Sequence, residues 1–186
     1  MTTFPTDLAS LTGRYTIDPA HSTIGFVARH AMVTKVRGAF NEFEGSAYFD
    51  GADPAKSTGK VTIKATSVDT RNADRDQHLR SNDFLNMDEY PEITFVSTAV
   101  RRTDDTSFEV TGDLTVKGVT KPVTIPFSYE GTATDPFGNV RVGLEGEVTI
   151  NRKDYGVVWN APLETGGVLV SEKIKLEFEI SAIKDA

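Results

Sequence analysis

The three histidines of the chain, His21, His30 and His78, are the first candidates for chemistry, because three imidazoles can hold a zinc ion and leave one position open for catalysis. No two of them have the spacing of a metal-binding motif, and His21 and His30 would face opposite sides of one uninterrupted strand. We therefore predict neither a metal site nor a cofactor. The simpler interpretation is that His21 bonds to a turn and that His30 or His78 is a buried polar group with a hydrogen-bond partner.

Asp18, His21 and Ser22 have the residue types of a hydrolytic triad, but His21 and Ser22 are adjacent and their side chains would diverge in an extended chain. This geometry argues against activation of the serine as a nucleophile. We predict no catalytic residue. An enzyme in which His30, His78 and nearby carboxylates act as acid and base on a small or lipidic substrate stays open as an alternative.

A short, charged helix is predicted over residues 73–80, because the side-chain oxygen of Asn72 can accept a free N–H of the first turn. The arginines on and beside this helix, Arg71, Arg75 and Arg80, could donate to an anionic or quinone-like head group at a barrel mouth. The helix could equally be a solvated surface with internal ion pairs. The same two interpretations apply to Arg152, Asp154 and Tyr155.

The rest of the chain alternates apolar and polar residues at the period of β-strands. This pattern predicts about eight strands, in residues 23–30, 39–49, 60–68, 93–100, 108–116, 119–129, 142–150 and 174–180. Phe40 and Phe43 are three positions apart and would face opposite sides of a regular strand, so a bulge or bend is expected between them. The predicted fold is all-β, an extended antiparallel eight-stranded barrel with one short helical insertion near residues 72–88, although a two-sheet sandwich would give the same pattern. Small residues at inward parity favour a cavity, namely Ala28, Ala65, Ala99 and Gly112.

Composition limits the classes of function. The net charge of −7 and the pI of about 5.0 repel a phosphate backbone, so nucleic-acid binding is not expected. No apolar run approaches the ~18 residues of a membrane-spanning helix. Residues 1–13 lack both a basic start and an apolar stretch, so we expect no secretory signal and a cytoplasmic protein. We expect residues 1–13 to be loosely ordered and residues 14–186 to form one domain.

Four motifs, the first of them in two parts, carry a family resemblance. RDQHLRSNDF at residues 75–84 is followed by YPEITF at residues 90–95, and the chain also contains IDPAHS at residues 17–22, GDLTVKGVTKP at residues 112–122 and INRKDYG at residues 150–156. Together they resemble the YceI-like family of polyisoprenoid-binding proteins, over roughly residues 14–183. The resemblance implies an extended, lipocalin-like barrel around a long isoprenoid.

The leading hypothesis is therefore a binding protein without enzymatic activity, which sequesters or transports a long-chain polyisoprenoid lipid such as a polyprenyl phosphate or a prenylated quinone. A homodimer and a stress-related structural protein whose barrel is filled by its own side chains stay open. The residues predicted to contact the ligand are Phe26, Ala28, His30, Phe40, Phe43, Val61, Ile63, His78, Phe84, Phe95, Leu114, Ile125, Phe127, Leu144, Trp159, Leu176 and Phe178.

Overall fold

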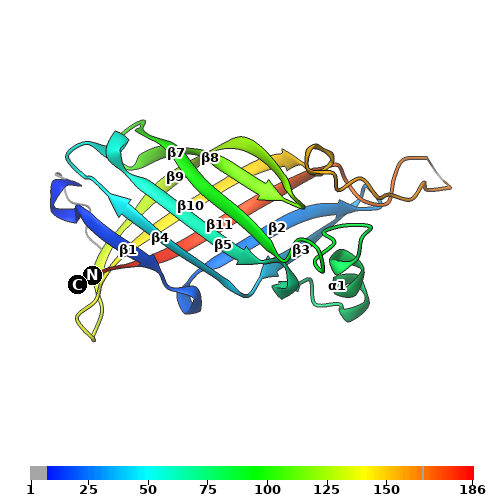
Figure 1. Ribbon diagram of the computed structural model, residues 1–186, viewed down its shortest axis with the longest axis horizontal. Helices are drawn as coiled ribbons and strands as arrows, with labels where there is room; N and C mark the ends of the chain where they lie inside the picture. Colours follow the sequence, from blue (N-terminus) through cyan, green and yellow to red (C-terminus); the bar gives the residue numbers. More distant parts are fainter. Residues whose placement is uncertain (1–7, 165) are drawn as a thin grey trace.

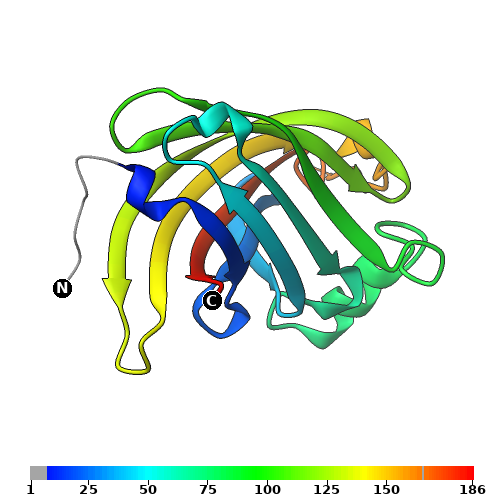
Figure 2. The same ribbon diagram turned by 60° about the vertical axis from the view of Figure 1, so that its left-hand side comes forward.

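Antiparallel strands pair around a closed circle in the computed structural model, which describes residues 8–164 and 166–186. The order around the barrel is β1 (Gly13–Ile17), β4 (Phe43–Phe49), β5 (Thr58–Lys64), β7 (Glu92–Arg102), β8 (Ser107–Val116), β9 (Val119–Thr134), β10 (Val140–Asn151) and β11 (Lys173–Lys184). The circle closes because β11 also pairs with β1. The prediction of an eight-stranded antiparallel barrel is thus confirmed (Figures 1 and 2).

Three further strands continue barrel strands after a break. β11 pairs with β1 near its carboxyl end and with β2 (Thr23–His30) further back, so β1 and β2 are two parts of one wall strand that the 3₁₀ turn Pro19–His21 interrupts. β3 (Thr34–Phe40) leads into β4, and β6 (Val68–Asp69) follows β5 after the 3₁₀ turn Ala65–Ser67. The bend expected between Phe40 and Phe43 is this gap between β3 and β4, but the strand begins at Thr34 and not at residue 39.

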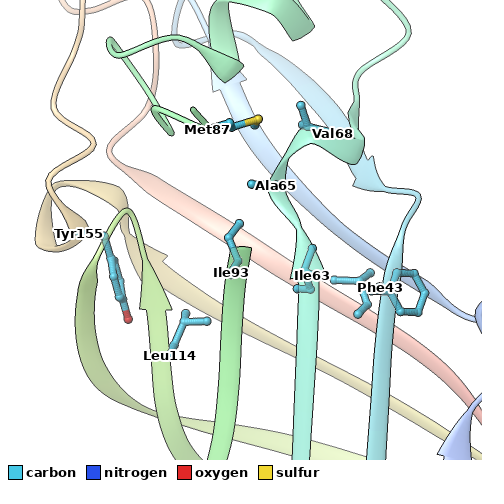
Figure 3. Close-up of a cluster of buried hydrophobic side chains, with 9 residues drawn as sticks. Phe43, Ile63, Ala65, Val68, Met87, Ile93, Leu114 and Tyr155 are labelled. Carbon is cyan, nitrogen blue, oxygen red and sulfur yellow. The ribbon is translucent and has the colours of Figure 1, made fainter. Parts of the chain in front are cut away.

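The helical insertion covers one end of the barrel, on the right in Figure 1. Helix α1 (Ala73–Arg80) has the predicted bounds, and the Asn72 side chain accepts a hydrogen bond from the Arg75 N–H at 3.1 Å. Phe84 and Met87 in the segment after the helix are buried. Figure 3 shows Met87 level with Val68 and above Ala65 and the ends of the strands that carry Ile63 and Ile93.

A second apolar cluster lies at the other end. Leu8 and Leu11, in the 3₁₀ helix Leu8–Leu11, are 3% and 8% exposed and pack with Phe108 and Tyr129. Residues 1–7 of the segment expected to be loosely ordered lie outside the described residues, whereas residues 8–11 are packed against the barrel. Two leucines three positions apart share one face of a helical turn, so Leu8 and Leu11 can be buried together.

Glycines opposite phenylalanines shape the inner wall. Phe26 lies directly across from Gly38, and Phe127 lies directly across from Gly146. A Cβ at Gly38 would overlap the Phe26 ring, and one at Gly146 would lie 2.6 Å from Cδ1 of Phe127. The two rings therefore lie against the backbone of Gly38 and Gly146, in space that any larger residue at these positions would fill.

A charged junction fixes the closure of the barrel. The Arg141 guanidinium donates to Asp18 at 2.7 Å and to Asp135 at 2.7 Å, which joins the start of β10 to the residue after β1. The Asp18 N–H donates to Ser181 O of β11 at 2.9 Å. These bonds from Arg141 hold the pKa values of Asp18 and Asp135 below their usual range.

Replacing Arg141 should weaken the fold in a pH-dependent way. A carboxylate whose pKa is lowered by folding contributes stability above its unfolded pKa of about 3.9, and loses it as the pH falls through the lower folded value. We expect Arg141→Gln to lower the Tm at pH 7, and the difference from the unsubstituted protein to shrink in acid. Thermal unfolding by circular dichroism across pH measures this.

Arg101→Gln is the control, because Arg101 pairs with Glu109 at 2.8 Å on the surface with 70% of its side chain exposed. Such pairs contribute about 0–1 kcal/mol, so its Tm should change little. A Tm deficit of Arg141→Gln that is as large in strong acid as at pH 7 would refute the electrostatic role of the junction.

A methyl group at Gly38 should compete with the Phe26 ring. Overpacking of this kind costs about 1–3 kcal/mol, so we expect Gly38→Ala to destabilise the barrel by that amount. Phe26→Leu in the same chain should remove part of the clash, which gives a coupling of at least about 0.5 kcal/mol in a double-mutant cycle. Gly59→Ala is the matched control, because its Cβ would meet Ala47 at an ordinary 3.7 Å. Additive effects of the two substitutions in denaturant unfolding would contradict the close packing.

Candidate functional site

The barrel encloses a long, narrow cavity of about 330 Å³. Alternate residues of β11 follow it along the wall, namely Ile174, Leu176, Phe178, Ile180 and Ala182. Eight steps along an antiparallel strand cover about 27 Å, so the cavity extends over most of the length of the barrel.

Most residues of the predicted set lie on the cavity wall, and nearly all of the wall is apolar. Those that line it are Phe26, Ala28, Phe40, Val61, Ile63, Phe84, Phe95, Leu114, Ile125, Phe127, Leu144, Leu176 and Phe178. Strand alternation brings all of them except Phe84 together, since one face of each strand points inward, and Phe84 reaches the cavity from the segment after α1. Their contact with a ligand stays a prediction.

The structure places the other four predicted residues outside the wall. Phe43 is buried in the cluster that includes Ile63, its neighbour across the β4–β5 pair. His30 is exposed at the last position of β2, where the hairpin leaves the barrel. His78 and Trp159 lie near the cavity end but contact Phe84, which itself lines the cavity.

His78, Phe84 and Trp159 form an aromatic seam between the α1 insertion and the loop after β10. The His78 ring meets Trp159 edge to face with centroids 4.7 Å apart, and meets Phe84 in the same way at 4.9 Å. His78 Nε2 lies 2.9 Å from an Asp83 carboxylate oxygen. Lys117 adds bonds across the same gap, to Asn82 O at 3.1 Å and Gly156 O at 3.4 Å. The two segments therefore close this end of the barrel together.

Arg152 and Tyr155, which the sequence left open as head-group contacts or a solvated surface, are both buried and line the cavity. Arg152 is 5% exposed and lines the cavity end beside the seam. Its guanidinium donates to three backbone carbonyls, Ser171 O at 2.8 Å, Val157 O at 2.8 Å and Val170 O at 3.3 Å. No ion pair in the described part of the chain involves Arg152, and burial lowers its pKa. A guanidinium still stays protonated, so a positive charge is buried beside this end of the cavity, close enough to the Glu172 carboxylate to interact with it.

The opposite end of the cavity has an uncharged phenol. Tyr15 lines it, and its hydroxyl donates to Leu11 O at 2.7 Å. Burial, with a smaller contribution from Tyr129, raises the pKa of Tyr15 to about 12. The two ends therefore differ in charge, with a buried cation at one and an uncharged phenol at the other.

The arginines of helix α1 serve the fold of their own segment. Arg75 donates to Thr70 Oγ1 and Thr70 O, both at 2.7 Å, and Arg80 donates to Thr66 O and Val68 O at 3.2 and 3.3 Å. These bonds hold the chain between β5 and the helix. Neither arginine lines the cavity.

The hydrolytic triad considered from the sequence does not assemble. His21 Nδ1 lies 2.7 Å from Asp18, but the Ser22 hydroxyl donates to Ser181 O at 3.2 Å and accepts from Ser181 N at 2.9 Å. Ser22 is thus part of the pairing with β11. Across residues 8–164 and 166–186, no group of three histidines or carboxylates lies close enough to hold a metal ion.

None of the helices formed by residues 8–164 and 166–186 has the length and apolar character needed to cross a bilayer.

Comparisons with solved structures find the same barrel. Burkholderia cenocepacia BcnA superposes with a TM-score of 0.78 at 25% identity, over 89% of this chain and 98% of that one. A polyisoprenoid binding domain from Saccharophagus degradans superposes with a TM-score of 0.70 over 92% of this chain and 98% of that one, and its 15% identity supports the fold alone.

Sequence comparisons agree with the resemblance of the four motifs. A UPF0312 protein of Pseudomonas aeruginosa is 47% identical over 137 residues, which cover 74% of this chain and 71% of that one. Protein YceI of Escherichia coli O157:H7 is 44% identical over the same shares. The model of the YceI-like domain matches residues 15–182, and the chain therefore belongs to the YceI-like family.

Proposed function

We propose that this protein binds a long-chain polyisoprenoid lipid in its barrel and sequesters or transports it without catalysing a reaction. The observation that carries the proposal is the continuous apolar wall over about 27 Å of β11, with a cavity of about 330 Å³ inside it. A long, narrow, apolar space fits one flexible hydrocarbon chain better than a compact polar metabolite.

The energetics favour a bound chain over an empty barrel. A chain that buries about twenty carbons gains roughly 16 kcal/mol at ~0.8 kcal/mol per CH₂. Association and ordering cost about 4–15 kcal/mol, so useful affinity needs no covalent or metal chemistry.

The charge difference between the two cavity ends supports an orientation for the ligand. A phosphate or a quinone carbonyl can accept from the buried guanidinium of Arg152, whereas the Tyr15 hydroxyl is uncharged and already donates to Leu11 O. The head group would then lie beside Arg152, and the isoprenoid tail would extend toward Tyr15. Polyprenyl phosphates and prenylated quinones both meet this requirement.

The relatives support the same class of ligand. The Saccharophagus degradans domain, described as polyisoprenoid binding, has the same barrel. The two histidines of the enzymatic alternative, His30 and His78, do not line the cavity, so no observation favours acid–base chemistry on its contents.

Filling the cavity with a large side chain should block binding. Ala28 lines the cavity, so we expect Ala28→Trp to weaken the binding of a prenylated quinone or a polyprenyl phosphate by about ten-fold or more, because the indole occupies the space of several methylene groups. Native mass spectrometry of the protein with added lipid measures the bound fraction. Ala52→Trp makes the same change at an exposed turn and should bind normally.

The purified protein itself gives the first decision. Native mass spectrometry followed by organic extraction should release one lipid per chain with mass increments of isoprene units. If the protein is empty and also fails to bind added prenyl lipids, the carrier function is wrong. Equal binding by Ala28→Trp and the unsubstituted protein would place the ligand outside this cavity.

A further inference from the structure

The hairpin between β2 and β3 presents apolar side chains to solvent at its tip. Met32 is 60% exposed and Val33 is 75% exposed. The Val33 N–H donates to His30 O at 3.1 Å, and Ala31 and Met32 at the centre of the turn have φ values of 50° and 67°. Such a turn favours asparagine and glycine. The chain instead places larger apolar residues where neither the backbone conformation nor water favours them.

Cations flank this apolar tip. Arg29 and Lys35 are exposed and lie directly across from each other on β2 and β3, although like charges at paired positions repel. No ion pair in the described part of the chain involves either of them. Residues 19–41 contain no aspartate or glutamate, in a protein whose net charge is −7. The hairpin therefore carries cations and no carboxylate of its own, on an acidic molecule.

The tip lies beside the charged end of the cavity. Ala28, at the base of the hairpin, lines the cavity. His30 forms an isolated antiparallel β-bridge with Val170, and Val170 also lines the cavity. The Ala31 N–H donates to Leu169 O at 2.8 Å, and Arg152 donates to Val170 O in the same loop. Figure 1 shows this hairpin and loop at the same end of the barrel as α1. Val158, next to the cavity residue Val157, adds a third exposed apolar side chain, with 59% exposure.

We propose that the hairpin tip, formed by Arg29, Met32, Val33 and Lys35, docks on the surface of a bilayer that contains anionic lipids, and that the isoprenoid enters and leaves the cavity at this end. Apolar side chains that enter the interface, together with basic residues that face anionic head groups, form a membrane-surface anchor. The transfer step rests on the proposed function, because it requires an isoprenoid in the cavity. The docking step rests on the tip alone.

Vesicle flotation tests the docking. Vesicles of phosphatidylcholine with phosphatidylglycerol should bind the unsubstituted protein, and vesicles of phosphatidylcholine alone should bind it more weakly. The double variant Met32→Asp/Val33→Asp should lose about ten-fold or more of its vesicle binding, because two carboxylates replace the apolar contact. Arg29→Gln/Lys35→Gln should reduce binding to the anionic vesicles alone.

Phe137→Asp is the matched control. Phe137 is 88% exposed at the tip of the β9–β10 hairpin, which lies at the opposite end of the barrel (Figure 1). This variant should bind vesicles as the unsubstituted protein does. Circular dichroism should show that all variants fold, since every substituted side chain is exposed.

Two readouts separate the docking from the proposed function. Met32→Asp/Val33→Asp should bind a prenylated quinone from detergent solution normally but should extract it from vesicles about ten-fold more slowly. If the unsubstituted protein fails to bind the prenylated quinone in detergent, the proposed function and the transfer step are both wrong. The flotation assay would still test the docking on its own.

Other results would overturn the docking proposal. Failure of the unsubstituted protein to float with anionic vesicles would do so, as would equal flotation of the double aspartate variant. A dimer in sedimentation velocity that dissociates in the aspartate variant, without any vesicle binding, would assign the tip to a second copy of this chain.

Discussion

The pairing of β11 with β1 is the interaction on which the rest of the structure depends. Closure satisfies the backbone donors and acceptors of every wall strand and leaves no edge in the circle of strands. It also forces one face of each strand inward, so alternate side chains line the cavity. Arg141, which ties Asp18 to Asp135, sits where the first and last parts of the chain meet. The volume of the cavity then depends on small choices on the wall, such as glycine at position 38 opposite Phe26.

The ends of the barrel have different structural roles. Leu8 and Leu11 pack with Phe108 and Tyr129 at one end, and Tyr15 donates its hydroxyl to the backbone of the same 3₁₀ helix. This end is closed by the chain before β1 with neutral groups. At the other end, α1 and the loop after β10 meet through ring edges and through hydrogen bonds to backbone carbonyls, and the buried cation lies just inside. An apolar chain with a polar head group therefore has one orientation that matches both ends.

Alternation in the sequence predicts the wall well, because a strand with one buried face must repeat every two residues. Leu114 and Ile125, for example, follow from parity alone. The alternating pattern predicts the wrong face where a β-bulge shifts the register of a strand pair. The bulge between Ser97 and Ala99 turns Ala99 to the outside, although its position in the alternating pattern predicts an inward side chain. The short strand β1 was missed because five residues offer too few alternations to be distinguished from an irregular terminus.

The burial of Arg152 could not be predicted from the local sequence for a different reason, although the sequence did offer Arg152 as a possible head-group donor. The carbonyls that accept its hydrogen bonds belong to Val157, Val170 and Ser171, and only the fold brings the last two beside it. The local sequence, with Arg152 between Asn151 and Lys153, is equally compatible with a buried arginine and with a solvated turn. Contacts between aromatic rings pose the same difficulty, because the meeting of Trp159 with His78 depends on where two loops end and not on their own periodicity.

The geometry of the α1 end links storage of a lipid to its exchange. An isoprenoid cannot cross water at a useful rate unless its tail stays covered, because every exposed CH₂ costs about 0.8 kcal/mol. Under the docking proposal the Met32–Val33 tip would bring the bilayer to the end that has the head-group cation. The cover there consists of Phe84 and Leu85, which line the cavity, and of the seam to Trp159. Separating the seam would break ring contacts and the two hydrogen bonds of Lys117, whereas unpairing a wall strand would break a whole row of backbone hydrogen bonds. Under the docking proposal, exchange of the lipid is therefore expected at the α1 insertion, with the closed circle of strands intact.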